Sequence, residues 1–480
     1  MVQKLLIFSL LVFLLGDLSY SFLQHYHRPF DGDLAGGVVP AKDVKMILDN
    51  PLGFRVFKEG VGYPNPNKFF SHWSLYQYFS TVPFVFQKFT DPINAAYLSA
   101  ALAKTLIQLS ILLLLTLYVT GCLNKKQLLV VASLMVPLFQ TNGYQSAMGI
   151  IDPATTYVFF YALPALLLMI YFYPLYFKIK YGITPGLFNY IKPFWLPLGL
   201  VSSLSGPLNP GITLIITLLL FMSFISENIR TGMSSGFWSK LKEALLKIPR
   251  DYYFYLLPVS LFSLYSLYLG SFNTTGSGNE GSLFSLFAKL PEGIFRAFTK
   301  MIGYPLLILV LFFNVYIIKK FTNNDEGLRL IRSFKWVGIF TSLYIVLLPL
   351  GGYREYRPFL LRYDTILPIT LMLFFIFGKI TLYLLINLRK KQLNWYVPLI
   401  LLVLLNYMLI DQSGFGSSEC ERTAMVELSR SKDTKVRLNN DCTVLSWSLM
   451  NDPAGSAIKT ALLKKWNILE DDKLFYQSGK

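Results

Sequence analysis

The chain has 480 residues, of which 54% are hydrophobic and 15% charged, and a formal net charge of +17. A mean hydropathy of +0.47 and a succession of long apolar runs exclude a soluble multidomain protein and predict an all-α polytopic membrane protein. The basic residues lie mainly in short clusters between the apolar runs, where orientation and lipid contact explain them, so no nucleic-acid partner is expected.

The apolar runs predict about eleven membrane spans, each near the ~20 residues that cross the hydrocarbon. The first, from Lys4 to Phe22, begins like a signal peptide but lacks a small-residue cleavage site, so we expect it to be retained. The weakest is 194–205, which is short and flanked by prolines. The predicted spans are 4–22, 93–120, 127–140, 154–177, 194–205, 209–227, 252–270, 301–318, 336–351, 365–387 and 395–411.

The basic clusters predict the orientation of these spans. With a cytoplasmic N-terminus and all the spans counted, every cluster lies inside, whereas omitting 194–205 would send the basic segment 230–250 outside. The C-terminal region is then extracytoplasmic. The clusters are at 125–126, 178–180, 230–250, 319–335 and 389–391.

The predicted transmembrane domain (1–411) includes two long outer segments, and a C-terminal domain (412–480) follows it. The first outer loop (23–92) is rich in aromatic residues, and the second outer segment (270–300) has apolar residues at helical spacing, so both predict helices in the membrane interface. The alternative for the first loop is a simple aromatic belt. The C-terminal segment (412–480) predicts a small α+β domain, in which Cys420 and Cys442 are placed to form a disulfide.

The first outer loop opens with a distinctive polar stretch. Asp31 and Asp33, separated by one glycine, could activate an acceptor hydroxyl or hold a divalent cation such as Mg²⁺ or Mn²⁺. The alternative is an Asp-Gly-Asp turn without chemistry. The neighbouring His25, His27 and Arg28 are candidates to bind a sugar or phosphate, and the absence of a spaced His or Cys ligand set in the sequence makes zinc an unsuitable metal.

A second candidate segment lies between the ninth and tenth predicted spans. Short outer loops are usually poor in arginine, yet this one carries three arginines, whose planar groups bind phosphate oxygens bidentately. We therefore expect an anionic ligand such as a lipid phosphate, with salt bridges to Glu355, Asp364 or the acids of the first loop as the alternative. The candidate residues are Tyr353, Arg354, Tyr356, Arg357 and Arg362.

Three further ionisable residues stand out. Asp17 and Lys104 fall within predicted spans at similar depth, so we expect an ion pair between the first two helices. Asp152, followed by a proline on an outer connection, is either a further carboxylate of the site or an ordinary turn before a helix, and the turn is favoured.

This arrangement resembles the GT-C superfamily of membrane glycosyltransferases. The shared features are one span, a long outer loop opening with an acidic motif, interfacial helices, many further spans and an outer C-terminal domain. The motif-level match is limited to Asp31-Gly32-Asp33. The Trp-Trp-Asp motif of oligosaccharyltransferases and the Asp-Glu pair of protein mannosyltransferases are missing, so the subclass, the acceptor and the metal requirement stay open.

The resemblance implies an inverting transfer of a sugar from a polyprenyl phosphate or pyrophosphate carrier to a glycan, lipid or protein acceptor. Asp31 would deprotonate or orient the acceptor, Asp33 would support it, and the three arginines would bind the departing phosphate. The segments 353–364 and 30–40 also resemble envelope proteins of the Bacteroidetes type, which implies a bacterial inner membrane with a periplasmic C-terminus. The rival predictions are a transporter or flippase of lipid-linked glycans and a non-catalytic envelope scaffold.

Overall fold

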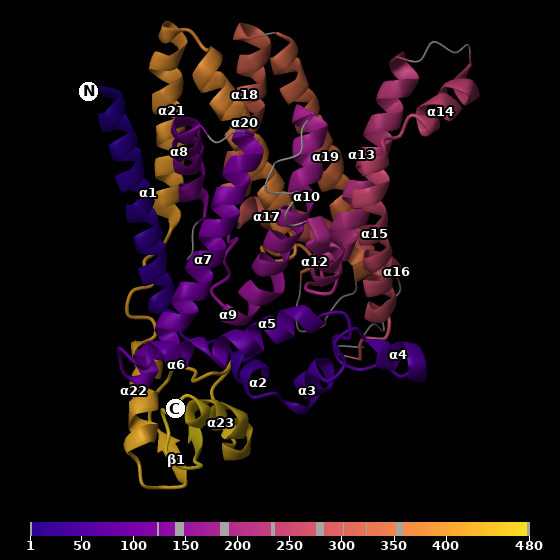
Figure 1. Cartoon of the computed structure of the whole chain (residues 1–480). Helices are drawn as coiled ribbons and strands as arrows, with labels where there is room; N and C mark the ends of the chain where they lie inside the picture. The colour runs from indigo at the N-terminus through magenta and orange to yellow at the C-terminus, as the bar shows by residue number, and fades with distance from the viewer. Residues whose placement is uncertain are drawn as a thin grey trace.

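The computed structural model describes residues 2–121, 124–139, 148–182, 192–231, 236–274, 283–300, 302–322, 324–351 and 359–477. Within these residues, nine helices are long and apolar enough to cross a membrane, which confirms an all-α, multi-pass membrane protein. They stand side by side as a bundle (Figure 1). They are α1 (Val2–Tyr26), α7 (Pro92–Thr120), α9 with α10 (Thr155–Tyr157, Leu163–Tyr181), α13 (Asn209–Thr231), α15 (Arg250–Gly270), α18 (Gly303–Phe321), α19 (Asp325–Leu347), α20 (Leu367–Asn387) and α21 (Lys390–Ile410).

Two of the predicted spans form shorter helices. The run 127–140 gives α8 (Lys125–Met135), followed by a short 3₁₀ turn (Val136–Leu138), and the run 194–205 gives α12 (Trp195–Ser203) after a similar turn (Lys192–Phe194). At about 1.5 Å per residue, α8 and α12 are roughly 16 and 14 Å long, about half the ~30 Å of hydrocarbon. Each helix alone therefore reaches only part of the way across.

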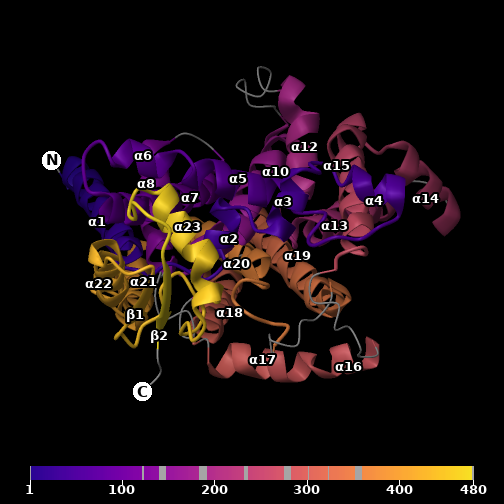
Figure 2. The same cartoon turned by 90° about the horizontal axis from the view of Figure 1, so that it is seen from below.

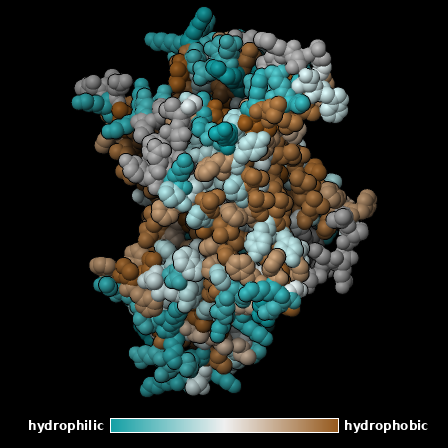
Figure 3. Space-filling view, turned by 45° about the vertical axis from the view of Figure 1, so that its right-hand side comes forward, coloured by the Kyte–Doolittle hydropathy of each residue, from teal (hydrophilic) through white to brown (hydrophobic). Residues whose placement is uncertain are grey.

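A layer of short helices lies across one end of the bundle (Figures 1 and 2). Helices α16 (Leu283–Ala288) and α17 (Leu290–Thr299) run along one side of the bundle, and α14 (Phe237–Leu246) lies at the end of the bundle opposite this layer. Figure 3 shows an apolar band between two hydrophilic ends, as expected for a membrane protein. The layer is made of α2 (Leu34–Val38), α3 (Lys42–Leu48), α4 (Phe54–Glu59), α5 (Phe69–Phe79) and α6 (Val82–Phe86).

The C-terminal region packs on this layer as part of one hydrophobic core. It contains α22 (Glu419–Arg430), α23 (Ala457–Lys465) and the parallel strands β1 (Lys435–Leu438) and β2 (Leu474–Gln477), with a 3₁₀ turn (Pro453–Ser456) before α23. Trp466, fully buried, packs against Phe30 and Phe79 of the first loop and donates its indole N–H to the Phe79 carbonyl at 3.0 Å. A disulfide joins Cys420 and Cys442. The first loop and the C-terminal region therefore form a single unit beyond this end of the bundle. We call it the outer unit, and the end of the bundle that carries it the outer end.

Helix α7 connects this outer unit to the bundle. Asp91 caps it by accepting the backbone N–H of Asn94 at 3.0 Å, and Pro92 occupies the first turn, where its missing N–H costs nothing. The hydrogen bonds to the carboxylate outweigh partial burial and lower the pKa of Asp91. Because most of α7 is buried among other helices, polar side chains on its outer half face protein rather than lipid.

Candidate functional site

Asp31 holds the first loop against the bundle. Its side chain is 4% exposed, and its carboxylate accepts the Thr156 hydroxyl at 2.6 Å and the Thr156 backbone N–H at 3.0 Å. It also accepts the backbone N–H of Asp33 at 3.2 Å. Thr156 belongs to α9, which begins the α9–α10 span. Asp31 therefore caps the outer start of that span, and both of its oxygens are in use.

The expected convergence of Asp31 and Asp33 does not occur. Asp31 is directed to α9, whereas Asp33 is exposed at the start of α2. Across the described segments, no group of three or more His, Cys, Asp or Glu side chains could hold a metal ion. The predicted Mg²⁺ or Mn²⁺ site at these two carboxylates therefore does not fit the geometry, because a buried oxygen that already accepts N–H and O–H donors is a poor metal ligand.

Lys104 of α7 lies beside Asp31. It is 1% exposed, and its ammonium donates to the Pro153 carbonyl at 2.5 Å. The carboxylates of Asp31 and Asp152 and the guanidinium of Arg28 are close enough to act on it electrostatically. A lysine at this depth needs such partners, since an isolated buried charge is costly.

The predicted ion pair between Asp17 and Lys104 is wrong. Lys104 instead faces the start of α9, and Asp17 lies near Asp411, just past the end of α21. Gln108 of α7 contacts Ser21 and His25 of α1. Lys104 lies about one turn from that level toward the start of α7, and Asp17 lies about one turn from it in the opposite direction, so the two residues are at different depths.

Asp152 is the buried carboxylate with an unused oxygen. It is 5% exposed, and Oδ1 accepts the Ala154 N–H at 2.7 Å, whereas Oδ2 has no hydrogen-bond partner in the described part of the chain. Burial raises its pKa to about 7, and the nearby Asp364 adds to the rise, while the Ala154 N–H, the Tyr363 hydroxyl and the Lys104 ammonium act against it. Asp152 can therefore exchange a proton near neutral pH, a property of catalytic acids and bases.

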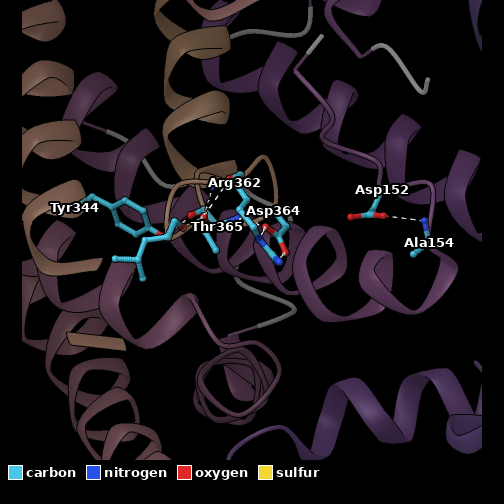
Figure 4. A network of polar contacts seen from close by, with 7 residues as sticks. Asp152, Ala154, Tyr344, Arg362, Asp364 and Thr365 are labelled. Atoms are coloured by element: carbon cyan, nitrogen blue, oxygen red, sulfur yellow. Dashed lines mark hydrogen bonds and ion pairs between the residues drawn. The ribbon is translucent and has the colours of Figure 1, made fainter. Parts of the chain in front are cut away.

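The segment before α20 approaches Asp152 from the other side (Figure 4). The Arg362 guanidinium pairs with the Asp364 carboxylate through two hydrogen bonds, of which the Nε to Oδ1 bond is 3.0 Å. The Thr365 N–H also donates to Asp364 at 2.8 Å, and the Tyr344 hydroxyl donates to the Thr365 carbonyl at 2.7 Å. These hydrogen bonds fix the turn, and its Asp364 carboxylate is close enough to raise the pKa of Asp152.

The predicted phosphate-binding residues meet this geometry only in part. Arg362 lies at the site with 20% of its side chain exposed, but it forms the salt bridge to Asp364 that was the alternative prediction. A phosphate would have to share Arg362 with Asp364. The other predicted residues of this segment lie outside the described residues, namely Tyr353, Arg354, Tyr356 and Arg357.

The two histidines serve packing. His25 is 2% exposed and its Nε2 lies 3.3 Å from the Gln108 amide oxygen, which links α1 to α7. The His27 ring makes edge-on contacts with Tyr26 and Phe415, at centroid distances of 5.3 and 5.6 Å. The buried His25 ring is therefore occupied in packing, and both His25 and Arg28 lie within electrostatic reach of Lys104.

Sequence reasoning missed Glu421, the anchor of the outer unit. Its buried carboxylate accepts the Phe30 N–H at 2.8 Å, the Tyr97 hydroxyl at 2.5 Å and the Leu445 N–H at 2.8 Å. Burial raises its pKa to about 7 against the effect of these three donors. The adjacent Arg422 stacks on Tyr97, 3.6 Å from the ring centroid. The signal was weak, because a charged pair on a polar helix usually faces solvent.

The chain matches no family model, no curated protein and no solved structure. The geometry of the site therefore carries the functional conclusion. Four separate segments converge at the outer end of the bundle, and they are the first loop with Asp31, α7 with Lys104, the connection with Asp152, and the turn with Arg362 and Asp364.

Proposed function

We propose that this protein is a membrane glycosyltransferase of the GT-C type, which moves a sugar from a polyprenyl phosphate or pyrophosphate carrier to a glycan, lipid or protein acceptor. The observation that carries the proposal is the convergence of the first outer loop and the arginine-bearing turn on Asp152, at one end of the bundle. Acidic and basic groups around one point are what a transfer between an acceptor hydroxyl and a lipid phosphate requires.

The proposal assigns the base to Asp152. Asp31 is the expected residue by family resemblance, but its oxygens already accept three hydrogen bonds, whereas Oδ2 of Asp152 accepts none within the described chain. A pKa of about 7 also keeps a useful fraction of Asp152 ionised at neutral pH. Asp31 then positions the loop, and Lys104 positions the two carboxylates.

The transfer balances with these groups. The acceptor O–H gives its proton to Asp152 Oδ2 as the acceptor oxygen bonds to the anomeric carbon. The bond from that carbon to the phosphate oxygen breaks, and its electron pair leaves on the phosphate, so the sugar inverts. Arg362 is placed to stabilise this leaving charge by exchanging one hydrogen bond from Asp364 to the phosphate.

The proposed topology places the site in the periplasm of a bacterial inner membrane. The N-terminus is cytoplasmic, and the chain returns outward between α7 and α9 and again between α10 and α13, which gives eleven crossings and a periplasmic C-terminus. The basic clusters at 178–180 and 389–391 then lie inside. A transporter or flippase would need polar groups through the bilayer midplane. The buried Lys104 and Lys379 lie instead near opposite ends of the bundle, the latter against Tyr176 late in α10.

The test uses the full-length protein in lipid nanodiscs. Polyprenyl-phosphate hexose and polyprenyl-pyrophosphate hexose are each offered with bacterial envelope extract as acceptor, and release of the free carrier is measured. We expect the wild type to release carrier, and Asp152→Asn to lower the rate by about 10²- to 10⁴-fold, the usual contribution of a general base. Asp33→Asn, the same change at an exposed carboxylate nearby, is the matched control and should retain the rate.

Three outcomes decide against the proposal. Full activity in Asp152→Asn would remove Asp152 as the base. Movement of a lipid-linked glycan across the bilayer without release of carrier would identify a flippase. If the protein affects neither carrier release nor glycan movement, the non-catalytic scaffold is the remaining function.

A further inference from the structure

A basic cleft lies in the first loop, away from the proposed site. Its volume is about 560 Å³, within the ~300–1,000 Å³ typical of small-molecule sites. Four cationic side chains line it against two carboxylates, and one carboxylate, Glu59, is already paired with Arg55 at 2.8 Å. The charged lining residues are Lys42, Lys45, Asp49, Arg55, Lys58 and Glu59.

Three lysines of this cleft have no acidic partner. Lys42, Lys45 and Lys58 are exposed and form no ion pair among the described residues, so Asp49 alone opposes them after the Arg55–Glu59 pair is set aside. Three ammonium groups around one hollow repel one another, and an anion in the cleft would relieve that repulsion. The charge pattern therefore favours an anionic ligand.

The cleft lies where the chain leaves the membrane. Helix α4, which lines it, is fixed to the outer end of α15, because Val56 is buried in a cluster with Leu269 and the Tyr265 hydroxyl donates to the Leu52 carbonyl at 2.6 Å. The loop after α4 also bridges to Asn273, just past the end of α15. The cleft therefore sits at the level of the lipid headgroups.

Helix α4 also presents aromatic side chains outward. Phe54 is 54% and Phe57 is 70% exposed, and their spacing of three residues puts them on one face of α4, opposite the buried Val56. Exposed aromatics at the end of a transmembrane helix insert among lipid headgroups and upper acyl chains. Inserted there, they would bring the cleft against the phosphates of the membrane.

We infer that the cleft between α3 and α4 binds the phosphate headgroup of an anionic phospholipid in the outer-face leaflet, with Phe54 and Phe57 in the adjoining hydrocarbon. This second site goes beyond the proposed transferase and does not depend on it. It fixes the far end of the first loop to the bilayer, while Glu421 fixes the near end to the C-terminal region. Lysine supplies the point charge for a phosphate, and several lysines together give preference for anionic lipids.

The test places an environment-sensitive fluorophore at Val61→Cys, an exposed position beside the cleft. Cys122→Ser removes the one cysteine outside the disulfide, so the label is specific. Full-length protein in non-ionic detergent is titrated with dihexanoyl phosphatidylglycerol, dihexanoyl phosphatidylcholine and inorganic phosphate. We expect saturable binding of phosphatidylglycerol, at least tenfold weaker binding of the other two, and weakening by salt.

The lysines provide the variants. The triple change Lys42→Ala, Lys45→Ala and Lys58→Ala should raise the Kd for phosphatidylglycerol at least tenfold, since each charge near an anionic headgroup contributes. The matched control changes three other exposed lysines of the outer unit to alanine and should leave the Kd unchanged. Its residues are Lys88, Lys432 and Lys435.

Three outcomes would overturn the inference. Equal Kd values for phosphatidylglycerol and phosphatidylcholine would show no recognition of charge. Equal Kd values for inorganic phosphate and phosphatidylglycerol would identify a site for a soluble anion instead of a lipid. An unchanged Kd in the cleft triple variant would locate binding elsewhere.

Discussion

Two buried carboxylates at the outer end of this protein have similarly raised pKa values but differ in the hydrogen bonds that they accept. Glu421, in the C-terminal region, and Asp152, ahead of α9, are both raised by burial to a pKa of about 7. Glu421 accepts three hydrogen bonds from three separate segments. Asp152 accepts one hydrogen bond, from its own turn, and the Tyr363 hydroxyl is close enough to lower its pKa, while Oδ2 has no hydrogen bond of ordinary geometry among the described residues.

In the proposed function this difference distinguishes Glu421, a structural carboxylate, from Asp152, the base. A buried carboxylate with all its donors in place holds the backbone around it, because each donor would otherwise be unpaired in a dry interior. A buried carboxylate with an open oxygen is costly unless something binds there, and such sites are often functional. Because the pKa is raised in both groups, the pKa alone does not distinguish them. The number of hydrogen bonds that each carboxylate accepts does.

The largest expected effect is on the transfer rate. Asp152→Asn should lower carrier release by about 10²- to 10⁴-fold, whereas Glu421→Gln should leave it within about twofold, since Glu421 contacts no reacting atom in the proposal. Both changes remove one ionisable proton from a buried site of similar pKa, so they are matched. Equal losses in the two variants would contradict the separation and show that the outer unit acts as one.

The order reverses for stability. Glu421→Leu leaves the Phe30 N–H, the Leu445 N–H and the Tyr97 hydroxyl without their acceptor, at about 1–3 kcal/mol each, so we expect a loss of about 3 kcal/mol or more. Asp152→Leu strands the Ala154 N–H and removes a carboxylate from beside the Tyr363 hydroxyl and the Lys104 ammonium, so it should cost about 1–2 kcal/mol before any effect of shape. Thermal unfolding in detergent measures both. A larger loss in Asp152→Leu would mean that Asp152 is the structural residue.

The sequence predicted the bundle better than the site. Nine of its spans are confirmed as long helices, because about 20 apolar residues have few alternatives in lipid. Hydropathy could not show that 127–140 and 194–205 form helices of 11 and 9 residues, since short apolar runs are equally apolar whether they cross or stop within the bundle. The hydropathy of the sequence therefore predicted the long transmembrane helices and not the lengths of the short ones.

The contacts of the site depend on residues far apart in the chain. Asp31 meets Thr156 over 125 positions, and Glu421 meets Phe30 over 391. The relative height of two helices is set by their packing and cannot be counted along the sequence: Gln108 of α7 lies against Ser21 and His25 of α1, which leaves Lys104 and Asp17 at different depths, and Lys104 meets Pro153 instead. Asp152, the carboxylate with an open oxygen, is likewise far from Asp31 in sequence, and both carboxylates act on Lys104.

The pH dependence of stability gives a smaller effect of known sign. Because both carboxyls bind protons more tightly in the folded protein than in the unfolded chain, where their pKa values are near 4, stability falls as pH rises from about 5 to 7. Each group should contribute about 2 kcal/mol over this interval. Asp152→Asn and Glu421→Gln should each flatten part of the slope in the thermal midpoint measured from pH 5 to 8. A slope unchanged in Asp152→Asn would show that its carboxyl is solvated.

The smallest effect tests the link through Lys104. Its ammonium lowers the pKa of Asp152, so Lys104→Met should raise that pKa and shift the acid limb of the rate profile upward, by less than about one unit. A lysine that only filled space would change the rate without moving the limb. Lys379→Met, at a buried lysine bonded to the Tyr176 hydroxyl at 2.5 Å, is the matched control and should leave the limb in place. If Lys104→Met also leaves it in place, the field of Lys104 does not reach Asp152, and only the Ala154 N–H and the Tyr363 hydroxyl oppose the rise in pKa caused by burial and Asp364.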